Sequence, residues 1–171
     1  RMCKIRIRNT PYRRMKLSKN LSLKEMTKSW TALRKGIDNT PTPEHIENMK
    51  ALAENIFQPI RDYFGVPIHI ASGYRSKALN EAIGGSKTSQ HSKGQAIDLD
   101  RDGHSQPDNS DLFIFVKDNL DFDQMIWEFG TDENPDWVHI SYNPGAKQRN
   151  QILVAYKDSK NRTRYKQWKK K

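Results

Sequence analysis

Two histidines and one aspartate are the residues of this sequence whose types and spacing most strongly indicate chemistry. His91 and Asp98 lie in the segment 89–98, and His139 follows in the segment 136–141. Imidazole nitrogens and a carboxylate oxygen are ligands that Zn²⁺ accepts, and three protein ligands leave a fourth coordination position for water. An open position distinguishes a hydrolytic zinc site from a structural one. The pattern therefore predicts a zinc ion that activates water.

Each of these residues alone also has a purely structural interpretation. His139 stands in an apolar segment, residues 137–141, where a histidine is more often a hydrogen-bonded residue of the core. A lone Asp98 can bind backbone N–H groups at the end of a strand. The combination with His91 favours a metal site, because zinc requires a convergent set of ligands.

The composition indicates one polar domain with basic ends. The chain has 171 residues, long enough for one domain with a hydrophobic core, and its mean hydropathy is −0.94. Residues 1–20 hold eight Lys or Arg and no acidic residue, and residues 157–171 hold eight and one acidic residue. We therefore expect a basic N-terminal arm over 1–20, the functional domain over 21–156 and a basic C-terminal tail over 157–171. Basic ends attract anionic polymers.

Several classes of protein are not expected from this sequence. No apolar run reaches the roughly 18 residues that cross a bilayer, and residues 1–19 lack the apolar centre of a secretory signal. A single cysteine, Cys3, excludes a disulfide within the chain. The basic ends come without an RNP, zinc-finger or helix-turn-helix signature, so no specific nucleic-acid partner is expected. We expect a monomer without a membrane span.

Helix signals cluster early in the chain and strand signals late. Ser22 and Glu25 have the spacing of a capping box, Thr42 marks the start of a second helix, and Pro59 should interrupt that helix. The expected helices cover residues 22–35, 42–64, 76–83 and 108–120, and the expected strands cover residues 2–8, 66–71, 96–100, 124–129, 137–142 and 151–156. This order predicts an α+β domain with helices on one face of a mainly antiparallel sheet.

Strand periodicity makes two further predictions about the metal ligands. Ala96 and Asp98 should share one face of their strand, with Ile97 on the other, and the small Ala96 leaves room beside a metal. Residues three apart on a regular strand point to opposite faces. Asp136 can approach His139 only where the chain bends, so Asp136 should lie before the regular strand.

The residue pattern around the ligands resembles the M15 class of zinc peptidases. The resemblance is carried by Ser89-x-His91-x-x-Gly94-x-Ala96-x-Asp98, by the segment 136–141 and, upstream, by the segments 29–32, 38–39, 58–61 and 72–76. It covers about residues 20–145. The class includes D-alanyl-D-alanine carboxypeptidases and related peptidoglycan peptidases, whose fold is shared by the hedgehog signalling domain. The resemblance thus implies this fold and hydrolysis of peptide bonds in the bacterial cell wall.

The resemblance also implies a role for individual residues. His91, Asp98 and His139 would bind zinc, Asp136 would be the acid/base, and Arg75 would stabilise the transition state. Structural alternatives remain for the last two: Arg75 can form an ion pair, and Asp136 can be a turn carboxylate.

Two further residues are weaker candidates, and several functional questions stay open. Glu128 should lie on a strand beside that of His139, and His104 follows an acidic run. Either side chain can contact substrate or have no functional role, His104 then being a surface-loop residue. The scissile bond is either the terminal D-Ala-D-Ala bond or an internal bond of the stem. A phage or bacterial lysin is expected, cytoplasmic until release or virion-associated, with basic ends that bind anionic wall polymer. The rivals are a non-catalytic, hedgehog-like zinc module and a polyanion- or nucleic-acid-binding protein.

Overall fold

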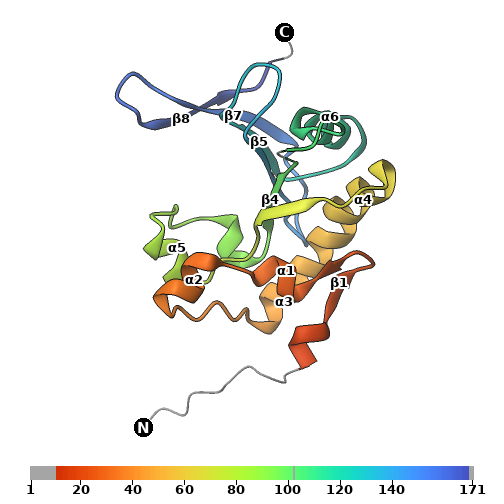
Figure 1. Ribbon diagram of the computed structural model, residues 1–171, viewed down its shortest axis with the longest axis vertical. Coiled ribbons are helices and arrows are strands. Elements are labelled where there is room, and N and C mark those ends of the chain that lie inside the picture. The colour runs from red at the N-terminus through yellow and green to blue at the C-terminus, as the bar shows by residue number, and fades with distance from the viewer. Residues whose placement is uncertain (1–10, 102, 170–171) are drawn as a thin grey trace.

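The protein has an α+β fold built on a mixed six-stranded sheet (Figure 1). Its computed structural model describes residues 11–101 and 103–169. The elements, in chain order, are η1 (Pro11–Arg14), β1 (Lys16–Ser18), β2 (Leu21–Ser22), α1 (Leu23–Thr27), α2 (Trp30–Lys35), α3 (Pro43–Leu52), η2 (Ala53–Phe57), α4 (Gln58–Phe64), β3 (His69–Ser72), α5 (Lys77–Ala82), η3 (Gln90–Lys93), β4 (Ala96–Asp100), α6 (Asn109–Asn119), β5 (Gln124–Glu128), β6 (Trp137–Ser141), β7 (Gln151–Lys157) and β8 (Thr163–Gln167).

The first helical region consists of two short helices instead of one continuous helix. Ser22 accepts a hydrogen bond from the backbone N–H of Glu25, and the Glu25 carboxylate accepts one from the Ser22 N–H, so the capping box is confirmed. The helix nevertheless ends at Thr27, and Ser29 provides a new N-cap for α2. Ser29 stands inside an otherwise helical pattern, which is why the pattern alone does not predict this break.

The long helical segment α3–η2–α4 contains one π-helical turn where Pro59 predicts an interruption. In this turn the N–H of Gln58 donates to the carbonyl of Ala53, five residues earlier. Proline lacks an N–H, and its ring clashes with the carbonyl four residues before it, so a wider turn accommodates it. The segment begins after its predicted cap, Thr42, and ends at Gly65, which adopts the left-handed conformation.

The sheet has the strand order β3-β4-β6-β5-β7-β8. Its neighbouring strands run antiparallel except β5 and β7, which run parallel. The expected α+β class is therefore confirmed, but the sheet is mixed. The parallel pair arises because the chain passes from β6 across to the other edge of β5. The placement of the helices on one face stays a prediction.

One face of the sheet packs into the hydrophobic core, and the opposite face carries the polar residues of interest. The core cluster includes Ile97, Leu99, Met125, Trp127, Val138 and Ile140 from the sheet, Leu52, Ile56 and Ile60 from the long helical segment, and Leu112, Phe113 and Val116 from α6. Successive side chains alternate along a strand. Asp98, Glu128 and His139 therefore lie on the face opposite the core. The prediction that Asp98 and Ile97 point to opposite faces of β4 is confirmed.

Both basic ends contain regular structure that the sequence analysis did not predict. Within the expected N-terminal arm, η1 and β1 are formed, whereas the expected strand over residues 2–8 lies outside the described residues. The expected C-terminal tail contains β8, which pairs antiparallel with β7. The connecting turn is held by Asp158, whose carboxylate accepts hydrogen bonds from Arg162 and Arg164. In the described part of the chain, no helix has the length and apolar character needed to cross a membrane.

Candidate metal centre

The three predicted metal ligands lie together on the face of the sheet opposite the core. Asp98 of β4 pairs directly with His139 of β6, and His91 approaches them from η3, just before β4. Asp98 Oδ1 lies 3.3 Å from His91 Nε2 and 2.9 Å from His139 Nδ1. Ligand atoms of the three residues all lie within 4.8 Å of one another, so one ion can contact all of them.

Backbone contacts fix the orientation of His91. Its Nδ1 lies 2.7 Å from the carbonyl oxygen of Gly73, which can only accept, so Nδ1 donates a proton there and Nε2 is the nitrogen that faces Asp98. Gly94 follows the His91 loop with a φ of +70°, and a Cβ there would lie 2.5 Å from the backbone oxygen of His45. The loop therefore requires glycine at this position.

Burial and mutual contacts set the protonation states of the ligands. Burial lowers the pKa of His91 more than the neighbouring Asp98 raises it, which keeps the imidazole neutral. Burial would raise the pKa of Asp98, but contacts with His91 and His139 outweigh it and hold that pKa well below its usual range. Neutral imidazole and ionised carboxylate are the forms that bind a metal.

Arg75 lies against the other oxygen of the ligand carboxylate. Its guanidinium Nη2 is 3.3 Å from Asp98 Oδ2, and its Nε donates to Ser72 Oγ at 3.0 Å. Its backbone N–H donates to the carbonyl of His91 at 3.2 Å. Arg75 thus belongs to the same cluster as the three ligands, where its positive charge lies beside the position at which they converge.

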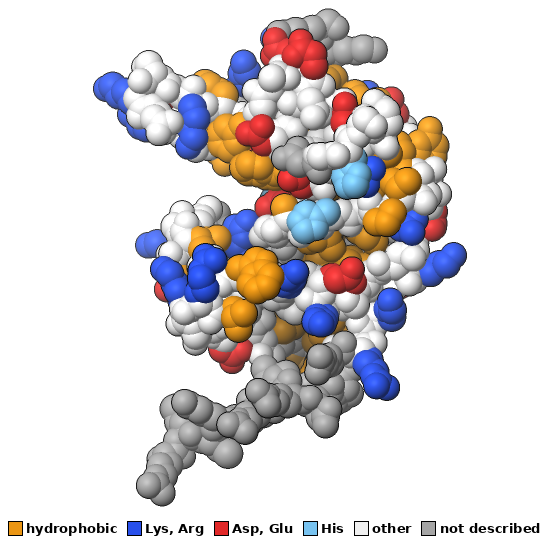
Figure 2. Space-filling model, in the orientation of Figure 1, with side chains coloured by type: hydrophobic (Ala, Val, Ile, Leu, Met, Phe, Trp, Pro, Cys, Tyr) orange, Lys and Arg blue, Asp and Glu red, His pale blue; other side chains and the backbone are white. Residues whose placement is uncertain are grey.

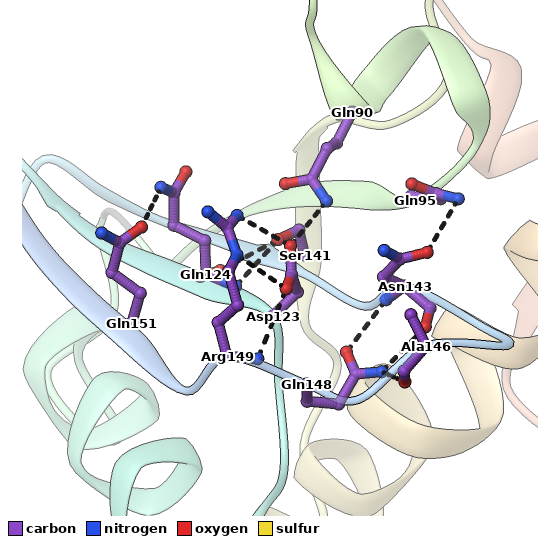
Figure 3. A network of polar contacts seen from close by, with 10 residues as sticks. All are labelled: Gln90, Gln95, Asp123, Gln124, Ser141, Asn143, Ala146, Gln148, Arg149 and Gln151. Atoms are coloured by element: carbon purple, nitrogen blue, oxygen red, sulfur yellow. Dashed lines mark hydrogen bonds and ion pairs between the residues drawn. The ribbon is translucent and has the colours of Figure 1, made fainter.

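A polar network holds η3, the short helix that carries His91, against the residues that precede β5 and β7 (Figure 3). Gln90, the neighbour of His91, donates to Asp123 Oδ2 at 2.9 Å, and Asp123 also accepts from Arg149 Nε at 2.9 Å. The hydrogen bonds from Arg149 lower the pKa of Asp123, which is 3% exposed. No sequence signal connects these residues, because they lie far apart along the chain and meet only through the sheet.

Glu128 is a buried carboxylate beside the three ligands. It ends β5 opposite Trp137 of β6, so it shares a face with His139, and it is only 8% exposed. Burial raises the pKa of Glu128 to about 7. His139 and Arg75 lower this pKa by their charge, and Asp98 raises it. Glu128 therefore lies within electrostatic reach of the whole cluster.

Asp136 lies immediately before β6, as the sequence predicts, but it is exposed. Its backbone N–H donates to the carbonyl of Glu128 at 2.9 Å, and its own carbonyl accepts from Asn109. Over residues 11–101 and 103–169, no hydrogen bond or ion pair reaches the Asp136 carboxylate. Of the two carboxylates considered from the sequence, the structure thus buries Glu128, and not Asp136, beside the ligands.

Metal-free protein with Glu128 replaced by glutamine should be more stable than the wild type above pH 7. Folding raises the pKa of this carboxyl, so the folded state holds its proton more tightly and stability falls as pH rises from about 4.5 to about 7. The shift corresponds to about 3 kcal/mol of unfolding free energy. Urea unfolding of both chelator-treated proteins at about pH 4 and about pH 8 measures this difference. A difference that does not grow with pH contradicts the burial of Glu128.

His104 lies away from this cluster, in the exposed loop after β4. It lines a surface hollow together with His69 and Asp100. That hollow includes none of the three metal ligands, so a contact between His104 and substrate has no support from the structure.

The donor set fits zinc. Two imidazole nitrogens and one carboxylate oxygen are a set that zinc accepts in hydrolytic sites, and the Nδ1 proton of His91 has the carbonyl partner that ligating histidines usually have. His91, Asp98 and His139 would hold the ion, and three ligands leave a position for water.

Comparisons with known proteins agree with this site. A family model described as Peptidase M15 matches residues 19–141, a range that contains all three ligands together with Arg75, Glu128 and Asp136. A search of curated proteins found no match. Because the match spans well over half of the sequence, the chain belongs to the Peptidase M15 family.

Proposed function

We propose that this member of a zinc-dependent peptidase family hydrolyses peptide bonds in the stem peptides of bacterial peptidoglycan. The observation that carries the proposal is the convergence of His91, Asp98 and His139 within 4.8 Å, with Glu128 and Arg75 beside them. The resemblance to peptidoglycan peptidases supplies the substrate class.

A proton acceptor and donor is needed beside the metal, and Glu128 fits this role best. Zinc, when bound, supplies a Lewis acid for the scissile carbonyl and lowers the pKa of a bound water. The Glu128 carboxylate would accept the proton of the attacking water and then deliver it to the leaving amine. A pKa raised to about 7 suits both transfers near neutral pH. We therefore propose Glu128 for the acid/base role, and Asp136, which the family resemblance implies, is the alternative that the experiment below distinguishes from it.

Arg75 would stabilise the negative charge that develops on the carbonyl oxygen. Its guanidinium is fixed by Asp98 and Ser72, so little reorganisation is needed when charge forms. One such pre-positioned donor can contribute about 3 kcal/mol to the transition state.

The shape of the molecule suits a chain-like substrate. The face seen in Figure 2 is deeply hollowed between the β7–β8 hairpin and the region of α2 and α5, and Lys and Arg side chains gather on the outer parts of both walls. Stem peptides carry carboxylates that a basic rim attracts. We further propose that the protein cleaves an internal stem bond and acts as a phage or bacterial lysin whose basic surfaces bind anionic wall polymer.

Product analysis tests the proposed function. Zinc-loaded protein is incubated with defined muropeptides, and the released fragments are identified by mass spectrometry. We expect cleavage of one stem bond, loss of cleavage after chelation, and recovery when zinc is returned. Stoichiometric zinc binding without any cleavage would contradict the proposal and favour a non-catalytic, hedgehog-like zinc module.

A further inference from the structure

The β7–β8 hairpin, which lies outside the part of the chain matched by the family, extends the face of the sheet that carries the metal ligands. Strand pairing places Trp137, Glu128, Ala155 and Tyr165 in one continuous row across β6, β5, β7 and β8. Residues that pair directly across strands project from the same face. Tyr165 therefore projects from the face that carries Glu128, two strands further along the sheet.

The residue between Glu128 and Tyr165 leaves space for the tyrosine ring. Ala155 is the smallest member of the row and is only 1% exposed, whereas Tyr165 is 55% exposed. Adjacent strands lie about 4.8 Å apart, so the tyrosine backbone is about 10 Å from that of Glu128. The phenol lies in the electrostatic field of the site: partial burial and the charges of Glu128 and Asp98 raise the pKa of Tyr165. The hydroxyl thus stays protonated and can donate a hydrogen bond.

The hollow seen in Figure 2 has a second wall, opposite the β7–β8 hairpin, which is formed by residues near Arg75, the arginine that contacts Asp98. A pocket of about 300 Å³ is lined there by Trp30, Tyr74, Arg75, Leu79 and Ile83, among others. Figure 2 shows the molecule hollowed between this region and the hairpin. A substrate that enters this hollow lies between these two walls, and one of them presents Tyr165.

We propose that Tyr165 is a substrate-binding residue whose hydroxyl donates a hydrogen bond to a carbonyl or carboxylate oxygen of the stem peptide. This inference rests on the proposed function. Glu128 lies between Tyr165 and the metal ligands in the pairing of the strands. Tyr165 therefore contacts the part of the peptide that flanks the scissile bond. A contact of this kind binds substrate and transition state alike, so it acts on KM and leaves kcat unchanged.

The hairpin offers a matched control on its other face. Tyr156 is 39% exposed and pairs with Arg164, the neighbour of Tyr165, so it projects away from the site. The ring of Tyr156 lies under Lys166 Nζ, at 5.1 Å. Replacing either tyrosine by phenylalanine removes one hydroxyl from the same hairpin.

Steady-state hydrolysis of a defined disaccharide–pentapeptide muropeptide, which contains both the terminal D-Ala-D-Ala bond and the internal stem bonds, by the zinc-loaded proteins tests the role of Tyr165. Tyr165→Phe should raise KM about five- to tenfold with kcat within twofold of wild type, as expected for the loss of one hydrogen bond. Tyr156→Phe should leave both constants within twofold. Binding of the same muropeptide to a Glu128→Gln protein, with and without Tyr165→Phe, should show the same loss of affinity by calorimetry.

The outcomes separate this proposal from the proposed function. A wild-type protein that cleaves the muropeptide, with Tyr165→Phe unchanged or no different from Tyr156→Phe, overturns the role of Tyr165 alone. A Tyr165→Phe defect confined to kcat also overturns it. If the wild-type protein neither binds nor cleaves the muropeptide, the proposed function fails and the role of Tyr165 fails with it.

Discussion

Replacing Glu128 by glutamine should lower kcat/KM about a thousandfold while the protein keeps its zinc. Glutamine has nearly the same shape but can neither accept nor deliver the proton. The wild-type rate should fall as pH decreases and Glu128 becomes protonated, and this acid limb should be absent from the residual activity of the variant. Hydrolysis rates across pH, measured beside zinc content, test the prediction.

Asp136→Asn is the matched control for this experiment. Asp136 is exposed, so its replacement should change kcat/KM less than about fivefold, in line with a surface substitution. The opposite pattern, a large loss in Asp136→Asn with an active Glu128→Gln protein, would restore to Asp136 the acid/base role that the family resemblance implies.

Replacing Arg75 by alanine should lower kcat about a hundred- to a thousandfold, the usual effect of removing a donor to a developing oxyanion. The guanidinium also contacts Asp98 Oδ2, so zinc affinity is measured by competition with a chelator in the same proteins. We expect zinc affinity within tenfold of wild type, because two effects oppose each other. Removing the positive charge beside the ion strengthens zinc binding, whereas removing the contact to Asp98 weakens it.

Ser72→Ala separates the position of Arg75 from its charge. It removes the acceptor of Arg75 Nε and leaves the guanidinium in place, so kcat should fall less than about tenfold. If the Arg75→Ala protein regains full activity once it is saturated with zinc, Arg75 is a structural partner of Asp98 and has no role in the transition state.

Local signals in the sequence predicted much of the secondary structure. Ser22 with Glu25, Thr42 and Gly65 mark helix boundaries through short-range hydrogen bonds and backbone preferences, which depend on few neighbours. The C-terminal strand was not predicted, because the charges of residues 163–167 obscure the alternation of Thr163, Tyr165 and Gln167. The position of β7 beside β5 depends on packing across the whole sheet, which periodicity does not encode.

The metal ligands could be predicted from their types and spacing, whereas the burial of Glu128 beside them could not. Asp98 and His139 stand in otherwise apolar strand segments, where such residues are uncommon, so their presence there is itself a signal, and His91 precedes Asp98 at a spacing typical of the family. The family resemblance singles out Asp136, and no local pattern indicates that Glu128 is the more buried of these two carboxylates. Burial distinguishes them, and burial depends on the pairing of β5 with β6 and β7.

Zinc content after reconstitution and extensive dialysis is the most direct measurement of the central claim, that His91, Asp98 and His139 bind one catalytic zinc ion. We predict one zinc per wild-type chain and per Glu128→Gln chain, and less than a tenth of that in His139→Ala and Asp98→Ala chains, because two ligands hold zinc far more weakly than three. Full zinc occupancy in a folded His139→Ala protein, or none in the reconstituted wild type, would contradict the account.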